Sequence, residues 1–261
     1  MNSPDNNHTT ASTLPFIGTS GWQHAHWRSR FYPAQLPTHA WLDHYGQQLN
    51  AVELDGGRLA HLDANLAATW RSTVPAHFSF TIQAPRTITH VHKLRNCSHL
   101  VTALLDRLHR LEQQLGPIIF SLPPRWHCNI DRLEHFLGAL PAGFRYAFEF
   151  HDRDWLRPET FALLQRHGAA LCLNDRMPLD SLSTITSDYT YARLYGPPAH
   201  GRYNSLGLRT WATRISAWQR RKLACYVLFQ NDLMAYAAKN ACLLRDFEDL
   251  RPLRRQIQVG G

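Results

Sequence analysis

The stretch that decides the fold is RYAFEFHDRDWLRPETFALLQRHGAALCLN, residues 145–174. It opens on a short apolar run, Arg145–Phe150, and closes on another, Ala169–Asn174, as two buried strands would. Between them, Pro158 suits the first turn of a helix and Gly168 suits its end. The segment therefore predicts a strand, a helix and a second strand, an order typical of parallel strand pairing.

The same alternation of short apolar runs and amphipathic segments continues along the chain. Helical spacing is clearest from Leu100 to Leu115, where a helix is expected to end at Gly116, and from Leu208 to Trp218. Eight such units in about 250 residues predict a single closed (β/α)8 barrel of the TIM type, and a doubly wound open sheet is the alternative. The other six expected strands are Phe16–Gly21, Ala51–Asp55, Phe78–Ala84, Pro117–Leu122, Tyr189–Tyr195 and Ala224–Gln230.

The charge of the chain is basic and almost entirely arginine. Among 261 residues, 28 are Lys or Arg and 20 are Asp or Glu, which gives a formal charge of +8. Arginine favours planar contacts with phosphate or carboxylate, and a basic balance suits polyanionic partners. The only lysines are Lys93, Lys222 and Lys239, and none lies in an apolar strand. Class I aldolase chemistry, which needs a desolvated lysine, is therefore excluded.

The chain reads as one domain with short tails. The barrel is expected over residues 16–250, between a flexible N-terminal tail (1–15) and a C-terminal tail (251–261). The first segment lacks the apolar stretch of a signal peptide, and no apolar run approaches the roughly 18 residues of a membrane helix. Five widely spaced cysteines without a C-x-x-C pair argue against a disulfide framework or a zinc ribbon. A cytoplasmic protein with no membrane partner is expected; its oligomeric state is left open.

Strand parity locates the candidate chemistry. Alternate side chains of a strand face opposite sides, and in four expected strands the apolar residues share one face. If those faces meet the helices, Glu53, Asp55, Gln83, Glu149 and Arg193 point into the barrel. They also lie toward the C-terminal ends of the strands, where barrel enzymes place their sites.

A series of short motifs runs along the chain: GTSGW (18–22), FYP (31–33), VEL (52–54), ITH (88–90), LGP (115–117), LPP (122–124), FEF (148–150), YARL (191–194) and ND (231–232). In this order they resemble the motifs of the YecE-like family, also called domain of unknown function 72. The resemblance covers residue 16 to about 247 and implies a TIM-type barrel. Structural kinship of that family with endonuclease-IV-like and sugar-isomerase-like barrels suggests, by analogy, nucleic-acid or sugar-phosphate substrates.

The chain departs from the family pattern near the expected barrel mouth. Asp55 replaces an asparagine, and residues 56–61 lack the aromatic pair that usually follows. Gln83 stands where a lysine is usual, His151 where an arginine is usual, and Tyr195 where a histidine is common. These changes imply either a different substrate or a lost activity.

Glu53, Glu149 and Arg193 are the candidate catalytic residues. In the enzymatic interpretation the carboxylates act as general acid and base, while Arg193 holds an anionic group. The chain would then be a hydrolase or lyase acting on a phosphate- or sugar-containing substrate. In the alternative the three form an internal ion-pair network, because buried charges need partners. The chain would then be an inactive binding protein for nucleic acid or a phosphorylated metabolite.

The candidate substrate-binding residues lie mostly in loops that follow the expected strands. Arg202 suits bidentate contact with phosphate, and aromatic residues suit stacking, although packing is an alternative role for the aromatics. No resident cofactor or metal is expected; a divalent metal on Glu53, Glu149, Asp175 and His90 is an alternative hypothesis. The full substrate-binding set is Trp22, Asp55, Gln83, His90, His151, Trp155, Asp175, Tyr195, Arg202, Asn231 and Asp232.

Overall fold

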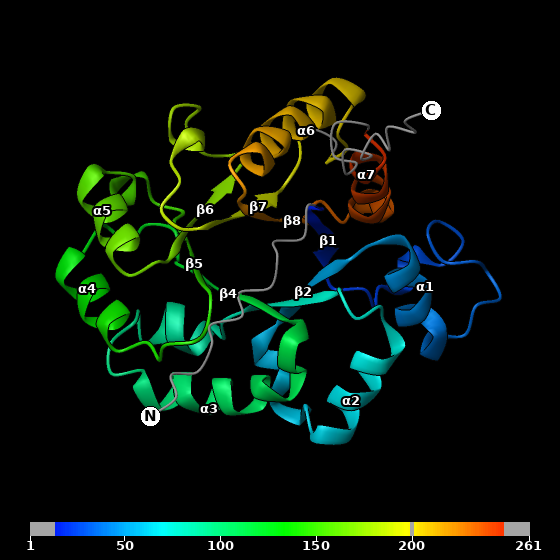
Figure 1. Ribbon diagram of the computed structural model, residues 1–261, viewed down its shortest axis with the longest axis horizontal. Helices are drawn as coiled ribbons and strands as arrows, with labels where there is room; N and C mark the ends of the chain where they lie inside the picture. The colour runs from blue at the N-terminus through cyan, green and yellow to red at the C-terminus, as the bar shows by residue number, and fades with distance from the viewer. Residues whose placement is uncertain (1–13, 199–200, 248–261) are drawn as a thin grey trace, which may run out of the picture.

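The computed structural model describes residues 14–198 and 201–247 and shows a closed barrel of eight parallel strands (Figure 1). The predicted (β/α)8 barrel is thus confirmed over the open-sheet alternative. Both expected tails lie outside the described residues, except for Leu14 and Pro15. Each strand neighbours the next in chain order, and the eight are β1 (Phe16–Ser20), β2 (Ala51–Asp55), β3 (Ser79–Gln83), β4 (Leu115–Ser121), β5 (Tyr146–Glu149), β6 (Ala170–Asn174), β7 (Tyr189–Leu194) and β8 (Ala224–Phe229).

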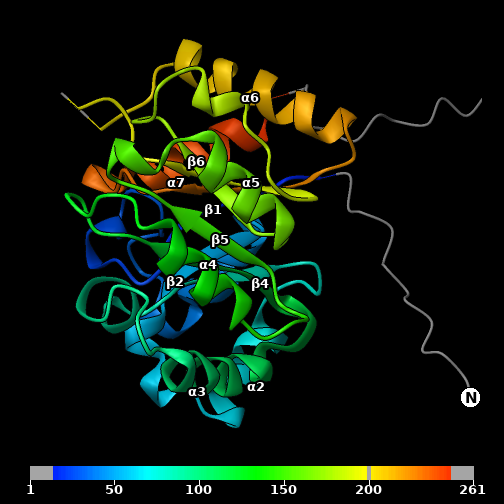
Figure 2. The same ribbon diagram turned by 90° about the vertical axis from the view of Figure 1, so that its left-hand side faces the viewer.

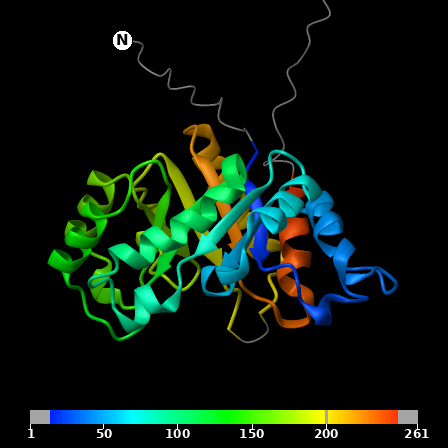
Figure 3. The same ribbon diagram turned by 90° about the horizontal axis from the view of Figure 1, so that it is seen from below.

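Helices surround this barrel, as the views in Figures 2 and 3 show. The connection from β6 to β7 differs from the predicted pattern, since its described helical turn is a short 3-10 turn, Ser181–Ser183. No helix in the described ranges is long and apolar enough to cross a membrane. The α-helices are α1 (Trp41–Gln48), α2 (Ala64–Thr73), α3 (Ser98–Leu108), α4 (Ile130–Gly138), α5 (Pro158–Arg166), α6 (Ser205–Arg220) and α7 (Tyr236–Arg245).

The structure confirms the strand, helix and strand predicted for residues 145–174. Strand β5 leads to α5, which begins at Pro158, and Gly168 follows that helix with a φ of +63° before β6. A positive φ costs glycine little, because it has no Cβ.

The predicted end of the third helix was wrong. Helix α3 ends at Leu108, and a 3-10 segment, His109–Gln114, bends at Glu112 before Leu115 begins β4. The helical spacing of the leucines therefore continues into a strand, because Leu115 pairs with Phe80 of β3 instead of extending the helix. Gly116 does not end a helix but lies inside β4, where a Cβ would come within 2.3 Å of Ser79 Oγ. It permits the close approach of β3 and β4.

The inside of the barrel is filled below its mouth. Inward-facing side chains form a separate apolar cluster that includes Ile119, Cys172, Tyr189, Tyr191 and Tyr226. Their alternation with outward-facing residues packed against the helices confirms the predicted strand parity. The charged inward-facing residues Glu53, Glu149 and Arg193 lie above this cluster, toward the C-terminal ends of their strands.

Candidate functional site

One arginine lies between two carboxylates in the upper part of the barrel. Glu53 from β2, Glu149 from β5 and Arg193 from β7 are each no more than 2% exposed. The Nη2 and Nε atoms of Arg193 lie 2.7 and 2.9 Å from the two carboxylate oxygens of Glu53. Its Nη1 atom lies 2.6 Å from Oε2 of Glu149. The structure thus brings together the three residues that strand parity had grouped.

Neighbouring side chains donate to the remaining lone pairs of Glu53. The Tyr191 hydroxyl donates to Oε2 at 2.6 Å, and the Gln230 amide donates to Oε1 at 3.1 Å. With the two bonds from Arg193, both oxygens of Glu53 accept two hydrogen bonds each. This carboxylate has few lone pairs left for a substrate proton.

Glu149 is held in the same way. The Tyr195 hydroxyl donates to Oε1 at 2.8 Å, and Ser121 Oγ donates to Oε2 at 2.8 Å. His151 Nε2 lies 3.3 Å from the same Oε2 and 3.0 Å from Ser121 Oγ. Asn174 Nδ2 adds a longer contact of 3.4 Å to Oε1.

The electrostatics of the network keep Glu149 and Arg193 charged. Burial raises the pKa of Glu149, but Arg193 and then His151 and Tyr195 outweigh it and hold that pKa far below its usual range. Burial also lowers the pKa of Arg193, yet Glu53 and Glu149 hold it well above its usual value. A general acid needs a raised carboxyl pKa, so the lowered pKa of Glu149 favours the ion-pair interpretation over acid catalysis by this residue.

A cavity of about 580 Å³ lies at the barrel mouth directly above the network. Four arginines and two histidines line it, and no aspartate or glutamate of the described residues does. Burial lowers the pKa of one of these histidines, His90, and nearby Arg86 and His151 lower it further. The lining residues are Gln83, Arg86, His90, Ser121, Pro124, Phe150, His151, Arg153, Leu156, Asn174, Arg176, Met177, Pro178, Arg193, Tyr195 and Gln230.

Three of the lining arginines are free of carboxylate partners. Arg86, Arg153 and Arg176 are exposed, and none of them belongs to an ion pair among the described residues. They follow three different strands, β3, β5 and β6. The Arg176 guanidinium lies 4.0 Å from the ring centroid of Tyr195, which fixes its direction.

Some of the predicted substrate-binding residues line the cavity, and the others lie beside it or elsewhere on the barrel. Gln83, His90, His151 and Tyr195 line the cavity. Asp175 lies beside it and orders the loop after β7, because its carboxylate accepts from the backbone amides of Tyr195 and Gly196 at 3.1 and 2.7 Å.

Two predicted aromatic residues and one acid lie away from the cavity lining. Trp22 is buried edge-on against Trp70, and Trp155 is fully buried with its indole donating to the Trp126 carbonyl. Packing explains both of these side chains. Asp55 is exposed at the end of β2, where its carboxylate accepts from the backbone amide of Gly57 at 2.9 Å.

The remaining three predicted residues belong to other parts of the barrel rim. Arg202 lines a second cavity of about 640 Å³ between α1 and α7. Asn231 donates to Asn240 at 3.0 Å, and Asn240 also accepts from the backbone of Tyr203, so this pair braces a loop. Asp232 lies against two histidines of the loop after β1.

Several cavity residues were absent from the predicted set. Ser121, Asn174 and Gln230 share the inward parity of Glu149 and Arg193, so extending that argument to β4, β6 and β8 would have found them. Arg86 and Arg153 lie at the start of short helical turns after β3 and β5, where no periodic pattern gives the direction of a side chain.

The metal set considered from the sequence, Glu53, Glu149, Asp175 and His90, is not gathered. Within the described part of the chain, the one group of three or more histidines, cysteines or acids with ligand atoms all within 4.8 Å comprises His24, His26 and Asp232.

Comparison with known proteins finds a family and relatives that match the sequence of this chain. The sequence profile described as "Protein of unknown function DUF72" matches residues 16–256. UPF0759 protein YecE of Escherichia coli K12 is 31% identical over 156 residues, which are 58% of this chain and about half, 54%, of YecE. UPF0759 protein YunF of Bacillus subtilis is 22% identical over 276 residues, covering 90% of this chain and 95% of YunF.

A solved structure has the same fold. The crystal structure of a DUF72 family protein from Thermotoga maritima superimposes with a TM-score of 0.79 and 23% sequence identity. The match covers 89% of this chain and 98% of the other. At that identity the likeness supports the barrel fold and nothing about the chemistry.

Proposed function

The chain belongs to the DUF72 family of proteins of unknown function, and we propose that it binds a small phosphate-bearing ligand in the cavity at its barrel mouth. One observation carries this proposal: four arginines and two histidines line the cavity, and no carboxylate of the described residues does. Its volume of about 580 Å³ lies within the range of small-ligand sites.

The lining suits a ligand with a phosphate at one end and hydroxyl groups at the other. Guanidinium groups bind phosphate oxygens through planar, charge-assisted hydrogen bonds, and Arg86, Arg153 and Arg176 supply three such groups without competing ion pairs. Amides of Gln83 and Asn174 offer donors and acceptors for hydroxyl groups. A sugar phosphate or a mononucleotide has this combination.

The buried network serves the cavity by fixing Arg193 in its floor. An arginine has five N–H donors, and three of those of Arg193 are engaged by Glu53 and Glu149. Two donors remain for a ligand in the cavity that Arg193 lines. Glu53 and Glu149 are then positioning residues rather than acid and base.

A second candidate function is hydrolysis or elimination on the same ligand. It is favoured by the presence of both His90 and His151 on the cavity wall, since histidine is the commonest acid–base catalyst near neutral pH. His151 is oriented by its contacts with Ser121 and Glu149. Turnover of a phosphate monoester or diester that is lost in His151→Gln would support this function; the absence of turnover across a substrate panel would exclude it.

The binding proposal is tested with matched ligand pairs. Calorimetric titration of the full chain with sugar phosphates and nucleoside monophosphates should give dissociation constants near or below about 100 µM at low salt. The corresponding free sugars and nucleosides should bind at least about 100-fold more weakly, because they lack the charge that the arginines recognise. Equal binding of the two members of each pair would overturn the proposal.

An oligonucleotide arm separates a cavity ligand from a nucleic-acid strand. If a single-stranded oligonucleotide binds far more tightly than its mononucleotide, with a steep loss of affinity as salt rises, an extended surface rather than the cavity is responsible. Similar affinities for the two would support the cavity.

A further inference from the structure

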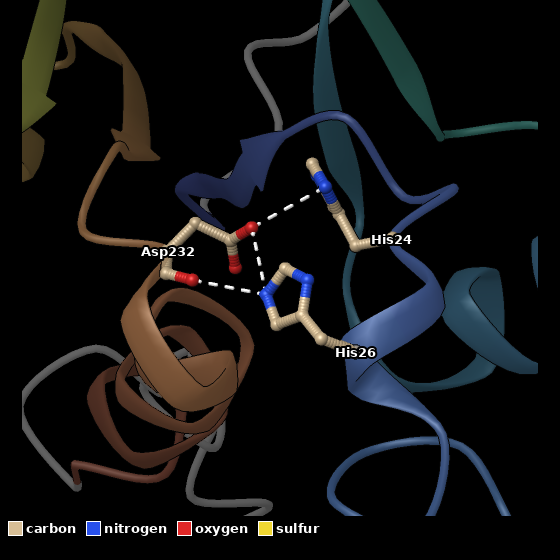
Figure 4. A group of neighbouring side chains, drawn as sticks. All are labelled: His24, His26 and Asp232. Atoms are coloured by element: carbon tan, nitrogen blue, oxygen red, sulfur yellow. Dashed lines mark hydrogen bonds and ion pairs between the residues drawn. The ribbon is translucent and has the colours of Figure 1, made fainter.

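Two histidines and a carboxylate meet where the loops after β1 and β8 lie side by side (Figure 4). His24 Nδ1 lies 3.3 Å from Oδ2 of Asp232, and His26 Nε2 lies 3.1 Å from the same oxygen. The three ligand atoms all lie within 4.8 Å of one another. None of these residues lines the cavity at the barrel mouth, so the cluster is a separate feature.

The hydrogen-bonding partners of His24 show that two acceptor atoms face each other in this cluster. Its Nε2 lies 2.9 Å from the Ser20 carbonyl oxygen, which only accepts, so Nε2 carries the hydrogen. In the neutral ring Nδ1 then has a lone pair, and that lone pair faces the Asp232 carboxylate. His26 Nε2 faces two acceptors on Asp232, the backbone carbonyl at 3.0 Å and Oδ2 at 3.1 Å, so it carries a hydrogen here and would give up that hydrogen to bind an ion.

We propose that His24, His26 and Asp232 bind a divalent metal ion, with zinc as the best fit. Two imidazole nitrogens and one carboxylate oxygen form a mixed ligand set suited to zinc, and a water would complete the tetrahedron. Zinc bonds of about 2.0–2.1 Å place neighbouring ligands of a tetrahedron about 3.3 Å apart. The observed separations of 3.3 and 3.1 Å match that edge.

The surroundings orient the ligands as they do in zinc sites. The Trp27 indole donates to Oδ1 of Asp232, which leaves Oδ2 for the ion. The Ser20 carbonyl fixes the tautomer of His24, and partners of this kind are common for metal-bound histidines. The side chains are 24–44% exposed, so an ion has access from solvent.

The test is a zinc titration of the tag-free full chain after removal of metal with a chelator. Competition against a fluorescent zinc indicator should give one ion per chain with a dissociation constant below about 1 µM. His24→Gln, His26→Gln and Asp232→Asn should each weaken binding at least about 100-fold. His39→Gln, which removes an exposed histidine elsewhere, is the matched control and should bind like the wild type.

Cobalt supplies a second readout that does not depend on affinity. One Co²⁺ per chain should give the visible absorption of a tetrahedral site, and Asp232→Asn should abolish it. Circular dichroism of each variant checks that the fold is retained. Absence of tight zinc binding, or equal binding by the wild type and Asp232→Asn, would show that the cluster is only a hydrogen-bonded ion pair.

Discussion

Replacing Arg193 by methionine is expected to lower the free energy of unfolding by about 3–5 kcal/mol. The arginine is the only cation bonded to both Glu53 and Glu149 among the described residues, and both carboxylates are buried. Without it the two buried carboxylates lose the cation that they share, and breaking a buried ion pair in this way costs far more than breaking an exposed one. Urea unfolding at pH 7, followed by tryptophan fluorescence, measures the loss.

Two control variants separate this effect from a general loss of packing. Removing all three charges together, in Arg193→Met with Glu53→Gln and Glu149→Gln, should recover much of the stability, because no buried charge is left unpaired. Arg166→Met breaks an exposed pair with Glu134 and should cost less than about 1 kcal/mol. A loss below about 1 kcal/mol for Arg193→Met would contradict this assignment. Insolubility of that variant alone, with a soluble triple variant, would support it.

Removing the three unpaired arginines at the mouth should reduce ligand affinity at least about 100-fold. Arg86→Gln, Arg153→Gln and Arg176→Gln together delete charge-assisted hydrogen bonds that contribute roughly 1.5–3 kcal/mol each. The measurement is calorimetric titration with the best phosphorylated ligand of the panel. Because all three are exposed, the variant should keep the stability of the wild type.

A charge-matched variant controls for the loss of three positive charges. Arg107, Arg220 and Arg221 lie at the C-terminal ends of α3 and α6, which point to the opposite end of the barrel from the mouth. Changing these three to glutamine should leave affinity within about threefold of the wild type, since surface charges farther than a Debye length are screened. Equal losses in the two triple variants would mean that only net charge matters.

The fold was predictable because its information is local. Each strand and helix of residues 145–174 is encoded by its own apolar spacing, with Pro158 and Gly168 at the helix ends, and repetition of that unit around the chain specifies a barrel. One local pattern misled the prediction. Leu115 continues a helical spacing yet begins β4, because pairing with β3 outweighs a local preference.

The candidate site was predictable only where a strand carries it. Period-two alternation predicts that Glu53, Glu149 and Arg193 share the inner face of the barrel, because side chains of a strand have only two directions. The direction of a side chain in a short helical turn has no such rule, and Arg86 and Arg153 were accordingly missed.

The cluster of His24, His26 and Asp232 could not be predicted from the sequence for a different reason. His26 and Asp232 are separated by 206 positions and meet only because closure of the barrel brings β8 beside β1. The sequence predicts Asp232 only as a candidate substrate-binding residue. Neither segment alone contains a metal motif.

The binding of a phosphate group by Arg86, Arg153 and Arg176 is tested most directly by anomalous diffraction. A crystal of the chain soaked in tungstate, a heavy analogue of phosphate, should show its strongest anomalous peak in the cavity above Arg193, in contact with at least two of these arginines. A strongest peak in the other basic cavity, beside Arg30, Arg202 and Lys239, or no peak at either place, would contradict the account.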